Sequence, residues 1–216
     1  FASNVSHELK TPLQSIIGRA ELIENGIVRP DDLQNFGKKI RSEGQALLNM
    51  INDIMFLSKV ESGVKAKSEH LNLKTLSESV VESLKDKASR KGVTISLESE
   101  ELEMNFVRRY MSEILYNLID NAIKYNKENG TVSCRIFRQE HKFFIVVKDT
   151  GIGIPKEDQD RIFERFFCVD RSHSNKDSTG LGLTIVKHIV EECHGTIDVD
   201  SKLGEGTTFT LAFEMA

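Results

Sequence analysis

Two long runs of apolar residues, spaced three and four positions apart, dominate the first part of the chain. The first run extends from Ala2 to Ile23, and it passes Pro12 without changing phase. This spacing gathers the apolar side chains on one side of an α-helix. Pro12 has no N–H for the carbonyl of Glu8, so we predict a continuous helix with a local bend there.

Pro12 also suits the first turn of a helix, with Thr11 as the N-cap and Gln14 completing a capping box. The unbroken apolar run favours the continuous helix instead. Residues three or four positions apart stack on a helix, so His7, Thr11 and Gln14 share a second, polar face. His7 is therefore predicted to point outward beside a hydroxyl.

The second apolar run extends from Leu33 to Leu57, after turn signals at Gly26 and Pro30, and it stops near Gly63. Residues 1–63 are therefore predicted to form an all-α helical hairpin. Two helices of this length cannot bury both apolar runs alone. We expect two copies of the chain to pair as a homodimer, whose four helices form a bundle.

The pattern changes beyond residue 63 to a mixture of helices and strands. Residues 64–71 are predicted to be a polar linker and residues 72–216 a second domain, an α+β two-layer sandwich with helices on one face of a sheet. A hairpin turn at Asn129-Gly130 is expected to join strands 131–137 and 142–149. The other predicted elements are helices over 73–91, 110–125 and 181–193, and strands over 93–98, 196–201 and 207–214.

Charge, hydropathy and cysteine usage exclude several classes of function. A net charge of -4 gives no basic footprint for nucleic acid. No apolar run approaches the roughly 18 residues of a membrane span, and no signal peptide is evident, so no membrane contact is predicted for this fragment; an anchored full-length protein, of which this is the cytoplasmic portion, stays open. Three cysteines without paired spacing indicate reduced thiols and a cytoplasmic location. The chain opens inside a helical pattern, and we expect it to be part of a longer protein.

Asn117, Asn121 and Lys124 form a polar stripe on a predicted helix whose other positions are apolar. Amide oxygens suit a hard cation such as Mg²⁺, and an ammonium can meet phosphate as a point charge. A solvated helix face explains the same stripe equally well, so the motif decides nothing alone.

Two glycine-rich stretches also have both a structural and a chemical interpretation. Asp149 precedes Gly151 and Gly153, a sequence that is typical of a plain turn. Its carboxylate is also suited to accept a hydrogen bond from the exocyclic amine of adenine, and it would repel the carbonyl of guanine. Gly180 and Gly182 open an amphipathic helix, where backbone amides can approach phosphate. Neither GxGxxG nor GxxxxGK[ST] occurs, which disfavours Rossmann and Walker sites.

The order of these motifs is far more specific than any one of them. N-x-x-D-N-A-x-K-Y, D-x-G-x-G and G-x-G follow one another over about 65 residues. This order resembles the adenine-nucleotide site shared by gyrase-type ATPases and sensor histidine kinases. "SHELKTPL" at residues 6–13 resembles the phosphoacceptor helix of the kinases, which the gyrase-type proteins lack. "IFERFF" at 162–167 is similar to the phenylalanine-rich segment beside the kinases' ATP lid.

The resemblance implies a histidine kinase that transfers the γ-phosphoryl group of ATP to His7 and then to an aspartate of a response regulator. Neutral imidazole has a free lone pair near pH 7, which agrees with that role. Glu8 is expected to hold the proton of the other ring nitrogen. Thr11 matches the position linked to the reverse reaction, removal of phosphate from the regulator.

The resemblance also implies a nucleotide site that uses ATP and Mg²⁺. Mg²⁺ and the phosphates are assigned to Asn117 and Asn121, with a phosphate contact from Lys124 and stacking or packing by Tyr125. Adenine is assigned to Asp149. The remaining expected residues are Gly151 and Gly153, which shape the adenine loop, and Gly180, Leu181 and Gly182, which flank the phosphates.

One position departs from the family pattern. Many relatives have an arginine before V-D that can reach the terminal phosphate, and here that position is Cys168. Arg165 or Arg171 is the expected substitute. Two alternatives follow: a phosphatase-biased or catalytically weak kinase core, and an ATP-driven clamp of the gyrase type that forms no phosphoprotein.

Overall fold

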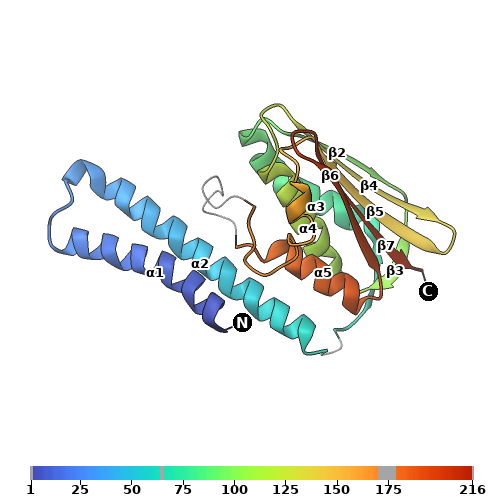
Figure 1. Cartoon of the computed structure of the whole chain (residues 1–216), viewed down its shortest axis with the longest axis horizontal. Helices are drawn as coiled ribbons and strands as arrows, with labels where there is room; N and C mark the ends of the chain where they lie inside the picture. The colour runs from blue at the N-terminus through green and yellow to red at the C-terminus, as the bar shows by residue number, and fades with distance from the viewer. Residues whose placement is uncertain (1, 64–65, 170–178, 216) are drawn as a thin grey trace.

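A long helical hairpin and an α+β domain make up the structure, a computed structural model that describes residues 2–63, 66–169 and 179–215 (Figure 1). The hairpin consists of α1 (Ala2–Glu24) and α2 (Leu33–Glu61), joined through a short 3₁₀ turn, η1 (Pro30–Asp32). Within the described residues, no helix has both the length and the apolar character needed to cross a membrane.

α1 is continuous through Pro12, as the unbroken apolar run predicts. Thr11 lies in mid-helix, where its hydroxyl donates to the carbonyl of His7 at 3.3 Å, so the alternative of a helix that starts at Thr11 is wrong. The two helices are linked across the hairpin by an Arg19–Glu43 ion pair, whose Nη1 and Oε1 atoms are 3.0 Å apart.

The α+β domain has two layers, as predicted. Its main sheet has the strand order β2-β4-β5-β7-β6, and three helices cover one face while the other face is open (Figure 1). The helices are α3 (Leu73–Arg90), α4 (Arg108–Lys124) and α5 (Gly182–Glu192). The strands are β2 (Thr94–Ser99), β4 (Thr131–Gln139), β5 (Lys142–Asp149), β6 (Thr196–Lys202) and β7 (Gly206–Glu214).

A second, two-stranded sheet was not predicted. Its strands, β1 (Glu69–Asn72) and β3 (Glu103–Phe106), pair antiparallel, so most of β1 lies inside the stretch expected to be a linker. Each strand has only four residues: β1 contains a single apolar residue, and the alternation in β3 is too short to distinguish a strand from a loop. A single-turn 3₁₀ helix, η2 (Lys156–Asp158), was also not predicted.

The β4–β5 hairpin turns at a different place from the one predicted. Gln139 pairs with Lys142, so the turn consists of Glu140 and His141, with Glu140 at a φ of 55°. The Asn129-Gly130 turn instead leads from α4 into β4. Asn129-Gly130 therefore does form a turn, but not the hairpin turn. The hairpin turn contains no glycine, because Glu140 adopts the positive φ.

Asn126, just after α4, ties that helix to the sheet from a position that is only 6% exposed. Its amide nitrogen donates to the carbonyls of Ala122 (2.9 Å) and Thr131 (3.0 Å). Its oxygen accepts from the Lys127 backbone at 3.0 Å and from the Thr150 hydroxyl at 3.3 Å. All of the amide's hydrogen-bonding groups are therefore used inside the protein.

Asn126→Ala is expected to lower the free energy of unfolding by about 2 kcal/mol, because it takes the amide donor from the carbonyl of buried Ala122 and removes the link from α4 to Thr131 and Thr150. Urea unfolding measures the change. Asn105→Ala is the matched control: Asn105 is exposed on β3, and a change within about 0.5 kcal/mol is expected. Equal effects of the two substitutions would contradict the proposed role of Asn126.

Candidate functional site

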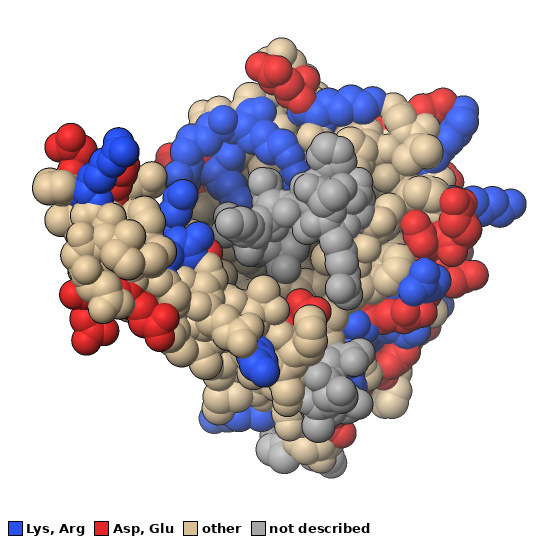
Figure 2. All heavy atoms as spheres, turned by 60° about the vertical axis from the view of Figure 1, so that its left-hand side comes forward, with Lys and Arg blue, Asp and Glu red and all other residues tan. Residues whose placement is uncertain are grey.

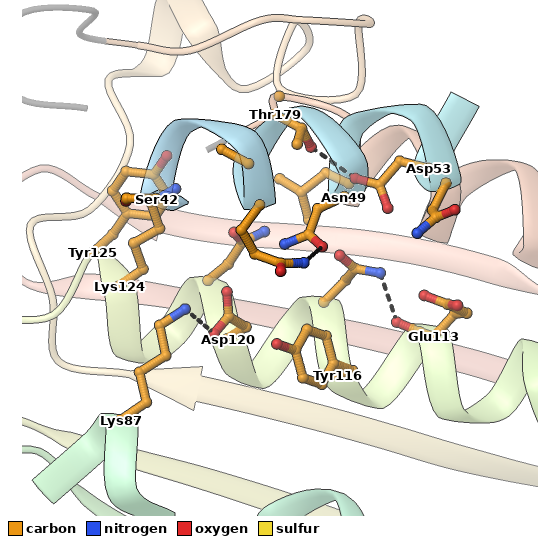
Figure 3. A pocket seen from close by; sticks show the side chains of 18 of the residues that line it. Ser42, Asn49, Asp53, Lys87, Glu113, Tyr116, Asp120, Lys124, Tyr125 and Thr179 are labelled. Atoms are coloured by element: carbon orange, nitrogen blue, oxygen red, sulfur yellow. Dashed lines mark hydrogen bonds and ion pairs between the residues drawn. The ribbon is translucent and has the colours of Figure 1, made fainter. Parts of the chain in front are cut away.

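A polar cavity of about 740 Å³ lies between α2 and α4 (Figure 3). Asn117, Asn121 and Lys124 all line it, so the stripe predicted on α4 is brought together on one wall. The facing wall is α2, which contributes Lys38, Arg41, Ser42, Gln45, Ala46, Asn49, Asn52 and Asp53. This second wall was not predicted. Polar residues recur along α2 at helical spacing, but that spacing does not indicate which face of α2 meets α4.

The first turn of α5 closes one side of this cavity against Asn117. A Cβ added at Gly182 would lie 2.5 Å from Oδ1 of Asn117, so only glycine permits this approach. Gly180 has a φ of +66°, which also favours glycine. Leu181 lies between them with its side chain fully buried, so only its backbone can face a ligand here.

A second cavity, of about 520 Å³, adjoins the first behind Asn121, Lys124 and Tyr125, which line both. Asp149 lines it and is only 8% exposed. Oδ1 of Asp149 accepts from the N–H of Gly151 at 2.7 Å and from the N–H of Thr207 at 3.3 Å. Burial raises the pKa of this carboxyl, and the two N–H donors oppose that rise.

Backbone contacts hold the loop after Asp149 in place. A Cβ at Gly151 would collide with the carbonyl of Tyr125, and one at Gly153 with the carbonyl of Lys202. The carbonyl of Tyr125 accepts from the N–H of Ile152 at 3.0 Å, which ties the loop to the end of α4. Both glycines therefore shape the rim of this cavity.

Positive charge gathers at the hollow in the molecular surface (Figure 2). The cations that line the cavity between α2 and α4 are Lys38, Arg41, Lys87 and Lys124, and Lys87 pairs with Asp120. At the other end of the cavity Asp53 and Glu113 contribute carboxylates. In a chain of net charge -4, four cations around one cavity favour an anionic ligand there.

His7 lies outside both cavities, with 79% of its side chain exposed. Its Nδ1 is 4.0 Å from Oε1 of Glu8. The described residues that line the two cavities include none from α1, and α2 lies between α1 and the α+β domain (Figure 1). The structure therefore does not bring the predicted phosphoacceptor residues and nucleotide residues together.

Arg165 does not line either cavity, contrary to its expected place beside a phosphate. Its guanidinium forms an ion pair with Glu61 at the end of α2. Cys168 lines the cavity that contains Asp149. Arg171, the other suggested substitute, lies outside the described residues.

Two family models match the chain. Residues 1–63 match the His Kinase A (phospho-acceptor) domain, and residues 106–216 match the histidine kinase-, DNA gyrase B- and HSP90-like ATPase. The chain belongs to the sensor histidine kinases.

Curated histidine kinases and solved structures agree with this membership. The circadian input-output histidine kinase CikA of Synechococcus elongatus is 34% identical over 98% of this chain and 29% of its own length. The sensor protein SrrB of Staphylococcus aureus is 33% identical over 98% of this chain and 37% of its own length. The chain thus spans only about a third of these relatives.

Histidine kinase AdeS of Acinetobacter baumannii is similar in structure with a TM-score of 0.81 and 27% identity, over 97% of this chain and 98% of that one. ShkA, solved in complex with AMPPNP, has a TM-score of 0.73 and 26% identity, over 99% of this chain and 46% of that one. The fold of a histidine kinase core, with hairpin and sandwich, is confirmed; the dimeric bundle stays a prediction.

If Asp149 accepts from adenine as the motif predicts, Asp149→Asn is expected to weaken ATP binding about tenfold, because an amide oxygen is a weaker acceptor than a carboxylate and the amide N–H₂ repels the exocyclic amine. Without nucleotide the same variant is expected to unfold at a higher temperature at pH 7. Burial raises the folded-state pKa of Asp149, so the ionised form costs stability above that pKa. This gain should disappear as the pH falls toward the pKa of an unfolded aspartate.

Isothermal titration and thermal unfolding measure the two effects. Asp198→Asn, at an exposed position on β6, is the control and should change neither quantity. Unchanged ATP affinity in Asp149→Asn would exclude the carboxylate from nucleotide recognition.

Proposed function

We propose that the chain is an ATP-dependent protein-histidine kinase that phosphorylates His7 and passes the phosphoryl group to an aspartate of a response regulator. The observation that carries the proposal is the pair of adjoining cavities. One contains a buried carboxylate suited to adenine, and the other presents amides and cations suited to a polyphosphate. An exposed histidine on the same chain supplies the acceptor.

Asp149 is the proposed adenine acceptor, with Ile152, Ile154 and Phe209 as the apolar part of that cavity. The chain of phosphates then extends past Lys124 and Asn121 toward Asn117 and the first turn of α5. Helix N-termini attract anions through their free N–H groups, which supports this direction. Gly180 and Gly182 let the backbone approach.

Asn117 and Asn121 would hold Mg²⁺ through their side-chain oxygens. Mg²⁺ in such sites takes few protein ligands and several from phosphate and water, and amide oxygens fit that requirement. Bound Mg²⁺ supplies charge neutralisation for phosphoryl transfer. Among the described residues no group of three or more histidine, cysteine or acidic side chains is arranged to hold a metal independently.

His7 is the proposed nucleophile. The 4.0 Å separation between Oε1 of Glu8 and Nδ1 supports a role for Glu8 in holding the proton on that nitrogen. Nε2 then attacks the γ-phosphorus with its lone pair, the bond to the β-γ bridging oxygen breaks, and ADP leaves. Thr11 lies one turn along α1 from His7, a position from which its hydroxyl would orient water in the reverse reaction on the regulator.

A catalytically weak or phosphatase-biased core is the second candidate. The family matches do not favour it over the kinase. It rests on Cys168 in place of the arginine that the resemblance predicts, and on Arg165, which pairs with Glu61 and lines neither cavity. A gyrase-type clamp is not favoured, because residues 1–63 match the phosphoacceptor domain.

We infer that the hairpin of residues 1–63 is a separate unit and pairs with a second copy. Large apolar side chains remain exposed on its two helices, including Leu13 (45%), Ile17 (47%), Leu48 (51%), Ile51 (39%) and Met55 (55%). Such a stripe on adjacent helices is the side that a four-helix bundle buries. The nucleotide-binding unit then begins at β1, and its use of ATP is consistent with the cytoplasm.

Incubation with Mg²⁺ and γ-labelled ATP is expected to place acid-labile, base-stable label on the wild-type chain. His7→Ala should remove the label completely, because the nucleophile is lost. His141→Ala, in the exposed β4–β5 turn, is the control and should be labelled normally. Label that survives in His7→Ala would contradict the assignment.

A wild-type chain that binds ATP and stays unlabelled would favour the weak-kinase candidate. Cys168→Arg then tests the cause, since it introduces the arginine that the resemblance predicts at this position.

Ile51→Asp is expected to convert a dimer into a monomer, because it puts a charge into the apolar stripe. Analytical ultracentrifugation across a concentration series measures the mass. Asn35→Asp, exposed on the same helix but pointing away from Ile51, should leave the dimer intact. A monomeric wild-type chain, or an unaffected Ile51→Asp dimer, would exclude this interface.

A further inference from the structure

A carboxylate of the hairpin lies at the place proposed for the distal phosphates. Oδ2 of Asp53, on α2, accepts from the hydroxyl of Thr179 at 3.0 Å (Figure 3). Thr179 precedes Gly180 and Gly182 at the start of α5, and Gly182 abuts Asn117. Asp53 therefore presents a negative charge to the phosphate end of the cavity.

The position of Asp53 is fixed by contacts on the following turns of α2. Phe56 is 5% exposed, meets the ring of Tyr110 edge-on, and has the guanidinium of Arg109 4.3 Å from its ring centroid. Glu61 pairs with Arg165 and, at 3.2 Å, with His188. These contacts fasten the C-terminal half of α2 to the α+β domain, so Asp53 cannot move away unless this interface loosens.

The charges around Asp53 disfavour a further anion. Glu113, on α4, is half-buried at the same end of the cavity. Burial raises its pKa, the guanidinium of Arg109 at 3.8 Å opposes that rise, and the nearby Asp53 adds to it. Burial likewise raises the pKa of Asp53, against the effect of the Thr179 hydrogen bond. Tyr116 is the third titratable group here, whereas the cations Lys38 and Arg41 lie at the opposite end of α2's wall. A phosphate brought to Asn117 thus meets two carboxylates.

We propose that Asp53 is an intramolecular competitor of the distal phosphates of ATP: its carboxylate occupies their place beside Thr179, and ATP must displace it to bind. The inference rests on the proposed nucleotide site and adds a residue from the other domain that sets its affinity. A carboxylate at a helix N-terminus interacts with the same N–H dipoles that favour phosphate.

Selectivity among nucleotides follows from the geometry. Asp53 does not line the cavity that contains Asp149, so the adenine end is independent of it. AMP, whose single phosphate lies nearest the adenosine, should not reach Asp53. ATP should reach Asp53. Its binding then breaks the hydrogen bond between Thr179 and Asp53, which is one of the contacts that hold α2 against the α+β domain.

The test measures the affinities of wild type and Asp53→Asn for AMP and for Mg²⁺-ATP by isothermal titration on the full chain. Asparagine keeps the shape and removes the charge. Asp53→Asn is expected to bind ATP about five- to tenfold more tightly, from the loss of one like charge at close range. Its affinity for AMP should stay within about twofold of wild type.

Two controls separate charge from structure. Asp53→Glu keeps the charge and should show no comparable gain for ATP. Asp198→Asn removes an exposed carboxylate on β6 and should bind both nucleotides like wild type. Thermal unfolding of each variant without nucleotide verifies that the chain is folded.

Each other result overturns the inference. Unchanged ATP affinity in Asp53→Asn shows no competition. Weaker ATP binding shows that Asp53 helps to hold the magnesium nucleotide. An equal gain for AMP and ATP shows a general loosening of the interface. If wild type binds neither nucleotide, the proposed function itself fails and takes this inference with it; in the other three cases the proposed function stands.

Discussion

The packing of α4 against the sheet is the constraint on which the rest of the structure depends. Ile114, Leu115, Leu118 and Ile119 are fully buried, and they fix the helix in its layer. The 3.6-residue period then leaves Asn117, Asn121 and Lys124 on the opposite side, where they line the cavity. Because core and site lie on one rigid helix, the site is as well ordered as the core that supports it.

The features that could be predicted are those set by local periodicity. The apolar runs on both sides of Pro12 indicated one helix, and the stripe on α4 placed three site residues on one face before any tertiary contact was known. Asp149 and its two glycines were recognisable because strand, turn and glycine follow one another directly. In each case the signal and its structural cause lie within a few residues.

The features that were missed depend on partners distant in sequence. Arg165 forms an ion pair with Glu61, 104 residues away, and no pattern in either segment indicates the other. Leu181 lies between Gly180 and Gly182, and the motif did not indicate that its side chain is buried in the core. The α2 wall of the cavity depends in the same way on how the two domains dock, which is a tertiary property.

α2 contacts α1, carries exposed apolar residues and lines the cavity, each with a different face of the helix. One face packs on α1 through Glu43, a second carries the exposed apolar residue Ile51, and a third presents Asn49 and Asp53 to the cavity. A rigid helix cannot turn one of these faces without turning the others. Rotation of α2 that repacks a dimer interface would therefore also move Asp53 relative to Thr179. His7 and the cavities proposed for the nucleotide lie on opposite sides of this helix, so the proposed phosphoryl transfer would require such a rearrangement if it took place within one chain.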